Sequence, residues 1–204
     1  LAASRHLLPY GGDAGGKLLA LPKGIVTFVG IIACIAFLVE GAIMDWGGVF
    51  LTTVRHFDMS LAGTAFTVFS AAMLTMRLFG DWTVQKLGQE RVVIGGSLLA
   101  VAGFLLVIFA AEPALLYLGF FAIGIGCANV VPVFFSLLGK QRVMPVSLAV
   151  PAVSTLGYLG ILMGPAVIGF IAHQTSLYTA FGLLAFLVLL QSIIAAYVYR
   201  HILD

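Results

Sequence analysis

Six apolar segments follow one another along the chain, separated by short stretches that carry most of its charged and turn-forming residues. A helix needs about 20 mostly apolar residues to cross the hydrocarbon core of a bilayer. The pattern predicts six membrane-spanning helices, at about 24–50, 60–79, 92–110, 114–138, 146–172 and 177–199. It lacks the short alternating strands of a barrel, and lipid does not tolerate unpaired backbone. The expected fold class is an all-α integral membrane protein.

The polar segments divide the chain into three parts. Residues 1–23, with Pro9 and several glycines, are expected to form a cytoplasmic linker. Residues 24–200 form the six-helix domain, and 201–204 form a cytoplasmic tail. Nine of the ten Lys and Arg residues lie on the side of the N-terminus, and only Arg55 lies opposite. Because basic loops stay in the cytoplasm, both termini are predicted to be cytoplasmic.

Composition excludes several classes of function. The chain is 62% hydrophobic and 9% charged, whereas a soluble domain is about 25% charged. A net charge of +2 without a basic stripe argues against nucleic-acid binding. His56 and His173 have no ligand-spaced partners, which argues against a metal site. No catalytic or nucleotide-binding motif appears, so we expect neither an enzyme nor a cofactor.

The segment between the second and third spans has an ordered set of glycines and charges. These residues are Arg77, Gly80, Asp81, Lys86, Gly88 and Arg91. Arg77 and Asp81 lie four residues apart, so we expect them to pair across one helical turn. Gly88 permits the chain to reverse into the next span. A basic loop of any polytopic protein would explain Lys86 and Arg91, but not the whole ordered series.

This series resembles the cytoplasmic signature loop of the major facilitator superfamily, although Trp82 stands where members often carry a basic residue. Residues 40–46, 124–132, 157–160 and 164–165 are similar to a bacterial branch related to sugar permeases. The resemblance implies helices seven to twelve of a twelve-helix transporter in the bacterial inner membrane. It also implies two three-helix inverted repeats and an N-terminal six-helix half of the same protein as partner.

The first span carries the charged residue expected to lie deepest, Glu40. Charges inside a membrane are costly and usually functional. Glu40 is expected in the outer third, or nearer the middle if the span extends through Phe50. Its role is either proton coupling or hydrogen bonding in a flooded vestibule. Asp45 and Trp46 are expected near the outer interface, where each is a binding group or an anchor.

The fourth and fifth spans contain helix breakers. Pro132, Pro151 and Pro165 lack amides, so both helices are expected to be interrupted, with Ala128 one of the freed carbonyls. Asn129, beside that carbonyl, is either a solute ligand or a bridge between helices. Tyr158, among glycines, is favoured as a cavity residue. Glycines of the fifth span are expected to pack helices closely.

Three functional hypotheses follow from these features. The first is proton-linked movement of a small neutral solute, such as a sugar, by alternating access, because no Lys or Arg is expected deep in a span. The second is proton-antiport efflux of amphipathic or cationic compounds through a cavity of Phe and Met. The third is a membrane scaffold, which would be insensitive to Glu40→Gln.

Overall fold

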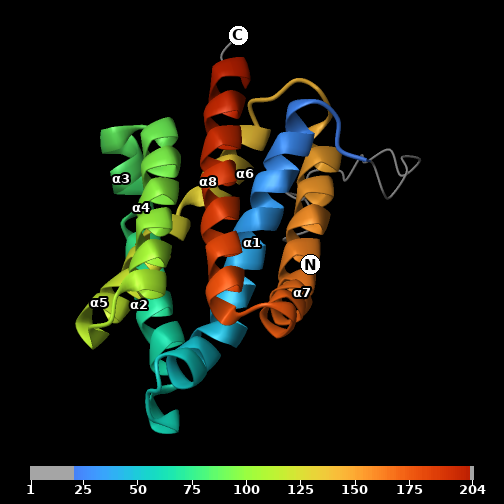
Figure 1. Cartoon of the computed structure of the whole chain (residues 1–204). Helices are drawn as coiled ribbons and strands as arrows, with labels where there is room; N and C mark the ends of the chain where they lie inside the picture. The colour runs from blue at the N-terminus through green and yellow to red at the C-terminus, as the bar shows by residue number, and fades with distance from the viewer. Residues whose placement is uncertain (1–20, 203–204) are drawn as a thin grey trace, which may run out of the picture.

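The computed structural model describes residues 21–202, and every regular element among them is a helix. Six spans are long and apolar enough to cross a membrane, which confirms the predicted fold class (Figure 1). Their elements are α1 (Ile25–Val49), the π-helix η2 (Phe50–Val54), the short 3-10 helix η3 (Met59–Leu61), α2 (Thr64–Leu78), α3 (Gly80–Leu87), α4 (Gln89–Phe109), α5 (Pro113–Cys127), α6 (Val130–Leu138), α7 (Val146–Gln174) and α8 (Leu177–Ile202). Most of the expected linker, 1–23, and the last two residues of the expected tail lie outside the described residues.

A short helix lies at each end of the bundle, α3 at one end and η3 at the other. At one end α1 begins, α8 finishes and α3 lies beside the start of α4; this is the α3 end (Figure 1). At the opposite end, the η3 end, η2 and η3 join α1 to α2. The spans among residues 21–202 alternate in direction and are six in number, so the first span begins and the last span finishes at the same end.

The predicted loop between the second and third spans is largely helical. After a break at Phe79, the chain forms α3, and Gly88 alone separates α3 from α4. Gly88 has φ 85° and ψ 150°, a conformation almost restricted to glycine because a Cβ atom would strain the backbone. The predicted reversal at Gly88 is confirmed, and it is a single-residue turn.

Proline has different effects in the fourth and fifth spans. The fourth span breaks between α5 and α6, at Ala128 and Asn129, as predicted. The fifth span is one continuous helix, α7, despite Pro151 and Pro165, so the predicted interruption there was wrong. Each proline removes one hydrogen bond from α7. The rest of the helix is supported by close packing along α1, where Gly157, Gly160 and Gly164 meet its side chains and carbonyls.

Small residues set the spacing of the other helices. The helix α4 lies between α5 and α8. A Cβ atom at Gly96 would lie 2.7 Å from the Gly126 carbonyl oxygen, and one at Gly103 would lie 2.6 Å from the Gly119 oxygen. Because lipid tails are as apolar as leucine, such close backbone packing is what favours helix association in a membrane.

Candidate functional site

Glu40 forms an ion pair with Arg77. The Arg77 Nη2 atom donates to Glu40 Oε1 over 3.1 Å. The side chain of Glu40 is 18% exposed and that of Arg77 is 41% exposed. An unpaired charge at this place would be costly, so each group compensates the other. The predicted pairing of Arg77 with Asp81 was wrong, because the break at Phe79 separates the two residues and the side chain of Arg77 extends toward α1.

The pair joins the middle of the first span to the end of the second, where Arg77 is the second-last residue. The first span continues through Phe50 and η2 as far as Val54, for 30 residues in all. Glu40 is therefore near its midpoint, which is the deeper of the two positions that the sequence allowed. Mid-membrane sites are where secondary transporters bind solutes and coupling ions.

Arg77 also contacts the broken fourth span. Its Nε atom donates to the Ala128 carbonyl over 3.3 Å. This carbonyl has no helical donor, because the residue four positions later is Pro132. The guanidinium thus links α1, α2 and the junction of α5 with α6, and the break provides it with an acceptor.

The ion pair borders a cavity of about 290 Å³ between α1, α2 and α7. Apart from the pair, Gly41 and Ser70, its lining is apolar: Met44, Phe66, Phe69, Met73, Leu74 and Ile161. The α2 residues recur every three or four positions, which places them on one helix face that ends at Arg77. The cavity can therefore hold an apolar or neutral body beside a charged pair.

Arg77 was not identified from the sequence as a cavity residue, and neither were Phe69 and Met73. Phe69 and Met73 are nearly buried, and both also line the cavity. The sequence signal that could have indicated the cavity is the recurrence of these residues every three or four positions along α2, up to Arg77. Arg77 is the second-last residue of the second span, near its end as expected, and its side chain borders the same cavity as Glu40.

Asp45 and Trp46 lie outside this cavity. Asp45 is exposed, about one and a half turns along α1 from Glu40. The Trp46 indole Nε1 donates to the Pro165 carbonyl over 3.2 Å, and a Cβ atom at Gly169 would lie 2.8 Å from its ring. Trp46 therefore packs α1 against α7.

Asn129 contacts the signature segment. It is 6% exposed, and a Cβ atom at Gly80 would lie 2.6 Å from its Oδ1 atom. Only glycine at position 80 lets α3 approach the break this closely. The Asn129 Nδ2 atom has no hydrogen-bond partner among residues 21–202, and both alternatives for Asn129 stay predictions.

Tyr158 lies on the open side of α7. It is 63% exposed, and its ring stacks on Phe37 with the centroids 6.2 Å apart. Phe37 precedes Glu40 by one turn on α1. Tyr158 is thus near the cavity without lining it.

The remaining signature residues lie within α3 or at the start of α4. Asp81 and Arg91 are exposed, and the Lys86 ammonium lies 4.7 Å from the centroid of the Trp82 ring. This cation–π contact gives Trp82 a role in place of the usual basic residue. Within residues 21–202, no three His, Cys, Asp or Glu side chains come together as a metal site would require.

Comparison with known proteins fits this architecture. Residues 27–202 match the family model described as Major Facilitator Superfamily. The chain is 45% identical over 190 residues to an uncharacterized MFS-type transporter of Yersinia pestis, covering 93% of this chain and 50% of that protein. It is 32% identical over 183 residues to an uncharacterized transporter of Sinorhizobium fredii, covering 90% and 48%.

Among solved structures, the chain resembles the POT family transporter PepTSo, with a TM-score of 0.73 and 19% identity, over 89% of this chain and 38% of that one. This likeness shows the fold. The chain spans about half the length of the curated relatives that it matches. With six membrane spans of this fold and a family model that matches nearly its whole length, the chain belongs to the Major Facilitator Superfamily.

Proposed function

We propose that this chain is half of a proton-linked secondary transporter and that the Glu40–Arg77 cavity is part of its solute site. The observation that carries the proposal is a carboxylate at the midpoint of the first span, paired with Arg77 beside a mostly apolar cavity. Protonation of Glu40 turns an acceptor into a donor and ends the charge attraction. Arg77 keeps the Ala128 carbonyl as an acceptor in that state. Proton binding can therefore change how the cavity holds a solute without leaving Arg77 unpartnered.

The solute proposed first is small and neutral, such as a sugar. The support is electrostatic: while paired, Glu40 and Arg77 cancel each other, so the cavity offers no net charge to an anion. A solute hydroxyl would hydrogen-bond to Glu40, Arg77 or Ser70. The phenylalanines and methionines of the lining favour a second candidate, an amphipathic or cationic compound expelled in exchange for protons.

The transport cycle proposed is alternating access against an N-terminal six-helix half. Relatives about twice as long support this partner. The second and fifth spans are only 22% buried over their most apolar stretch, against 67% for the fourth. They therefore have surface left for lipid or for further helices. The protein is proposed to lie in the bacterial inner membrane, with the α3 end in the cytoplasm.

The test uses the purified full-length protein and follows its thermal unfolding with sugars, polyols and hydrophobic cations at two pH values. A bound solute raises the midpoint because it stabilises the folded state. We expect one class of compound to raise it in a pH-dependent way. The pH dependence should disappear in Glu40→Gln and persist in Glu112→Gln, a matched change at an exposed carboxylate outside the cavity.

Sugars or polyols as the active class would favour the first solute, and hydrophobic cations would favour the second. Asp45→Asn adds a further control. If Asp45→Asn abolished the pH dependence and Glu40→Gln kept it, the assignment to Glu40 would be wrong. If no compound acted on any variant, the scaffold alternative would replace transport.

A further inference from the structure

A second cavity, of about 340 Å³, lies at the α3 end between α4, α6 and α8. It is far along the bundle from Glu40, because it is bordered by the first turn of α4 and by Tyr199, close to the last residue of α8. Its polar lining consists of Gln89, Glu90, Arg91, Lys140 and Tyr199. The transport mechanism proposed above uses none of these five side chains as a solute or proton ligand.

The Tyr199 hydroxyl has no hydrogen-bond partner among residues 21–202. Tyr199 is only 5% exposed, and its ring is held against Phe134, with the centroids 5.8 Å apart. Burying a hydroxyl without a partner is costly, and folded proteins rarely leave one so. Tyr199 is one of the residues that line the cavity, and its hydroxyl oxygen is itself buried. A molecule bound in the cavity that reached this oxygen would supply the missing partner.

Other hydrogen-bond donors belong to residues that border the same cavity. The amides of residues 89–91 precede the first hydrogen bond of α4, which Val92 donates to Gly88. A helix N-terminus with free amides attracts anions. Arg91 and Lys140 add two positive side chains at the border of the cavity. The amides, the two cations and a buried hydroxyl form a donor set of the kind that phosphate oxygens require.

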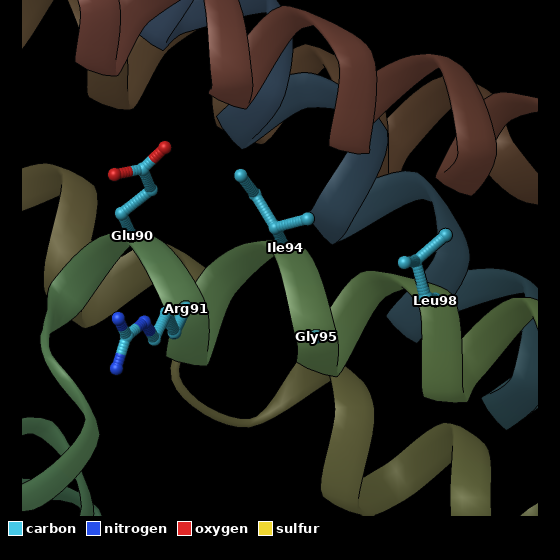
Figure 2. A pocket seen from close by; sticks show the side chains of 5 residues that line it. All are labelled: Glu90, Arg91, Ile94, Gly95 and Leu98. Atoms are coloured by element: carbon cyan, nitrogen blue, oxygen red, sulfur yellow. The ribbon is translucent and has the colours of Figure 1, made fainter.

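Two lining residues limit what can bind. The Gln89 side chain already donates to Ser136 Oγ over 3.2 Å, so it holds α4 to α6. Glu90 is the acid of the cavity and opposes an anion. Figure 2 draws a neighbouring pocket on α4 that shares Glu90 and Arg91 with this cavity, and it shows the two side chains directed to different sides of the first turn of α4. The cavity is bordered by one carboxylate, by the two basic residues Arg91 and Lys140, and by the N-terminus of α4.

We propose that this cavity binds a phosphate-bearing headgroup, with Tyr199, Lys140 and the first turn of α4 as its ligands. The phosphate comes either from a membrane phospholipid or from a soluble phosphate ester. The position favours a lipid, because the ends of α4 and α8 lie where headgroups meet the bundle, and basic pockets between spans bind such groups. A water molecule alone would satisfy Tyr199 but would leave the two cations unexplained.

The experiment uses the full-length protein, purified and depleted of lipid, and records thermal unfolding with added probes. Phosphatidylglycerol is compared with diacylglycerol of the same acyl chains, which lacks only the phosphate headgroup. Glycerol 3-phosphate tests the soluble source. We expect phosphatidylglycerol to raise the midpoint and diacylglycerol to leave it unchanged. A rise with glycerol 3-phosphate alone would assign the site to a soluble ester.

Tyr199→Phe removes one oxygen atom and keeps the packed ring. We expect it to weaken phosphate-dependent binding about tenfold, the usual effect of losing a hydrogen bond to a charged group. Lys140→Gln should act similarly. The matched controls are Tyr197→Phe, an exposed tyrosine of α8, and Lys23→Gln, a basic residue that does not line the cavity. Both should bind as the unmodified protein does.

Three results would overturn the proposal. They are equal effects of diacylglycerol and phosphatidylglycerol, no effect of any phosphate probe, and unchanged binding in both Tyr199→Phe and Lys140→Gln. A purely structural hydroxyl would lower the midpoint of the ligand-free protein when removed and leave the probe-induced rise intact. If Lys140→Gln did not fold, the comparison of Tyr199→Phe with Tyr197→Phe would still decide.

Discussion

The Arg77 side chain makes two contacts with two different parts of the bundle. Its guanidinium donates to Glu40 on α1 and to the Ala128 carbonyl at the break of the fourth span. Removing Arg77 would leave a carboxylate in the middle of the membrane and a carbonyl without a donor. Removing Glu40 alone would leave the cation with one acceptor. The two residues should therefore not contribute independently to stability.

We predict that Arg77→Gln lowers the free energy of unfolding by about 1–2 kcal/mol. This is less than the loss of one partner costs in a fully buried pair, because both side chains keep some exposure. The double variant Glu40→Gln/Arg77→Gln should recover most of the loss, since it leaves no unpaired charge. Thermal unfolding of the purified protein measures both.

Arg142→Gln provides the control for removing a positive charge, because Arg142 is exposed and follows α6. It should leave the midpoint within experimental scatter. A double variant as unstable as Arg77→Gln alone would show that Arg77 stabilises the bundle through Ala128 and that its pairing with Glu40 adds nothing.

The helices α4 and α5 are held together by two glycine pairs. Gly96 and Gly103 lie seven residues apart on α4, and Gly119 and Gly126 lie seven apart on α5. Each residue faces the backbone of its opposite number. A spacing of seven returns to nearly the same helix face, so both pairs lie along one seam. Gly95, one position from Gly96, faces open space.

Alanine should therefore have opposite effects at two glycines of α4. Gly103→Ala places a methyl group 2.6 Å from the Gly119 oxygen, which forces α5 away and should destabilise by about 1–3 kcal/mol. Gly95→Ala meets no atom within 4 Å and should stabilise by about 0.5–1 kcal/mol through reduced backbone entropy in the unfolded chain. Unfolding midpoints compared side by side test both signs, and equal effects would contradict the seam.

At the scale of the whole molecule, the orientation in the membrane determines which side of the membrane the α3 end and its cavity face. The bias in basic residues predicts that the α3 end lies in the cytoplasm. Two exposed serines mark the two ends: Ser147 lies in the first turn of α7 at the α3 end, and Ser60 lies in η3 at the other. Each can be replaced by cysteine with almost no change in size.

In a variant without Cys34 and Cys127, we expect Ser60→Cys to react with a membrane-impermeant maleimide in intact cells. Ser147→Cys should react only after the cells are opened, because the α3 end is predicted to face the cytoplasm. The parent variant without cysteines controls for background labelling. The reversed pattern would invert the orientation and move the phosphate-binding cavity to the outer surface.

The sequence by itself determined the six spans, the break before Pro132 and the reversal at Gly88. Each of these depends on local constraints: bilayer thickness, a missing amide and a positive φ. Only the tertiary structure decided the partner of Glu40. Arg77 lies 37 residues away, and sequence spacing favoured Asp81 because it assumed a helix that continues through Phe79. The break there and the packing of α2 against α1 brought Arg77 to the cavity, since contacts between helices depend on crossing geometry that periodicity along one helix does not encode.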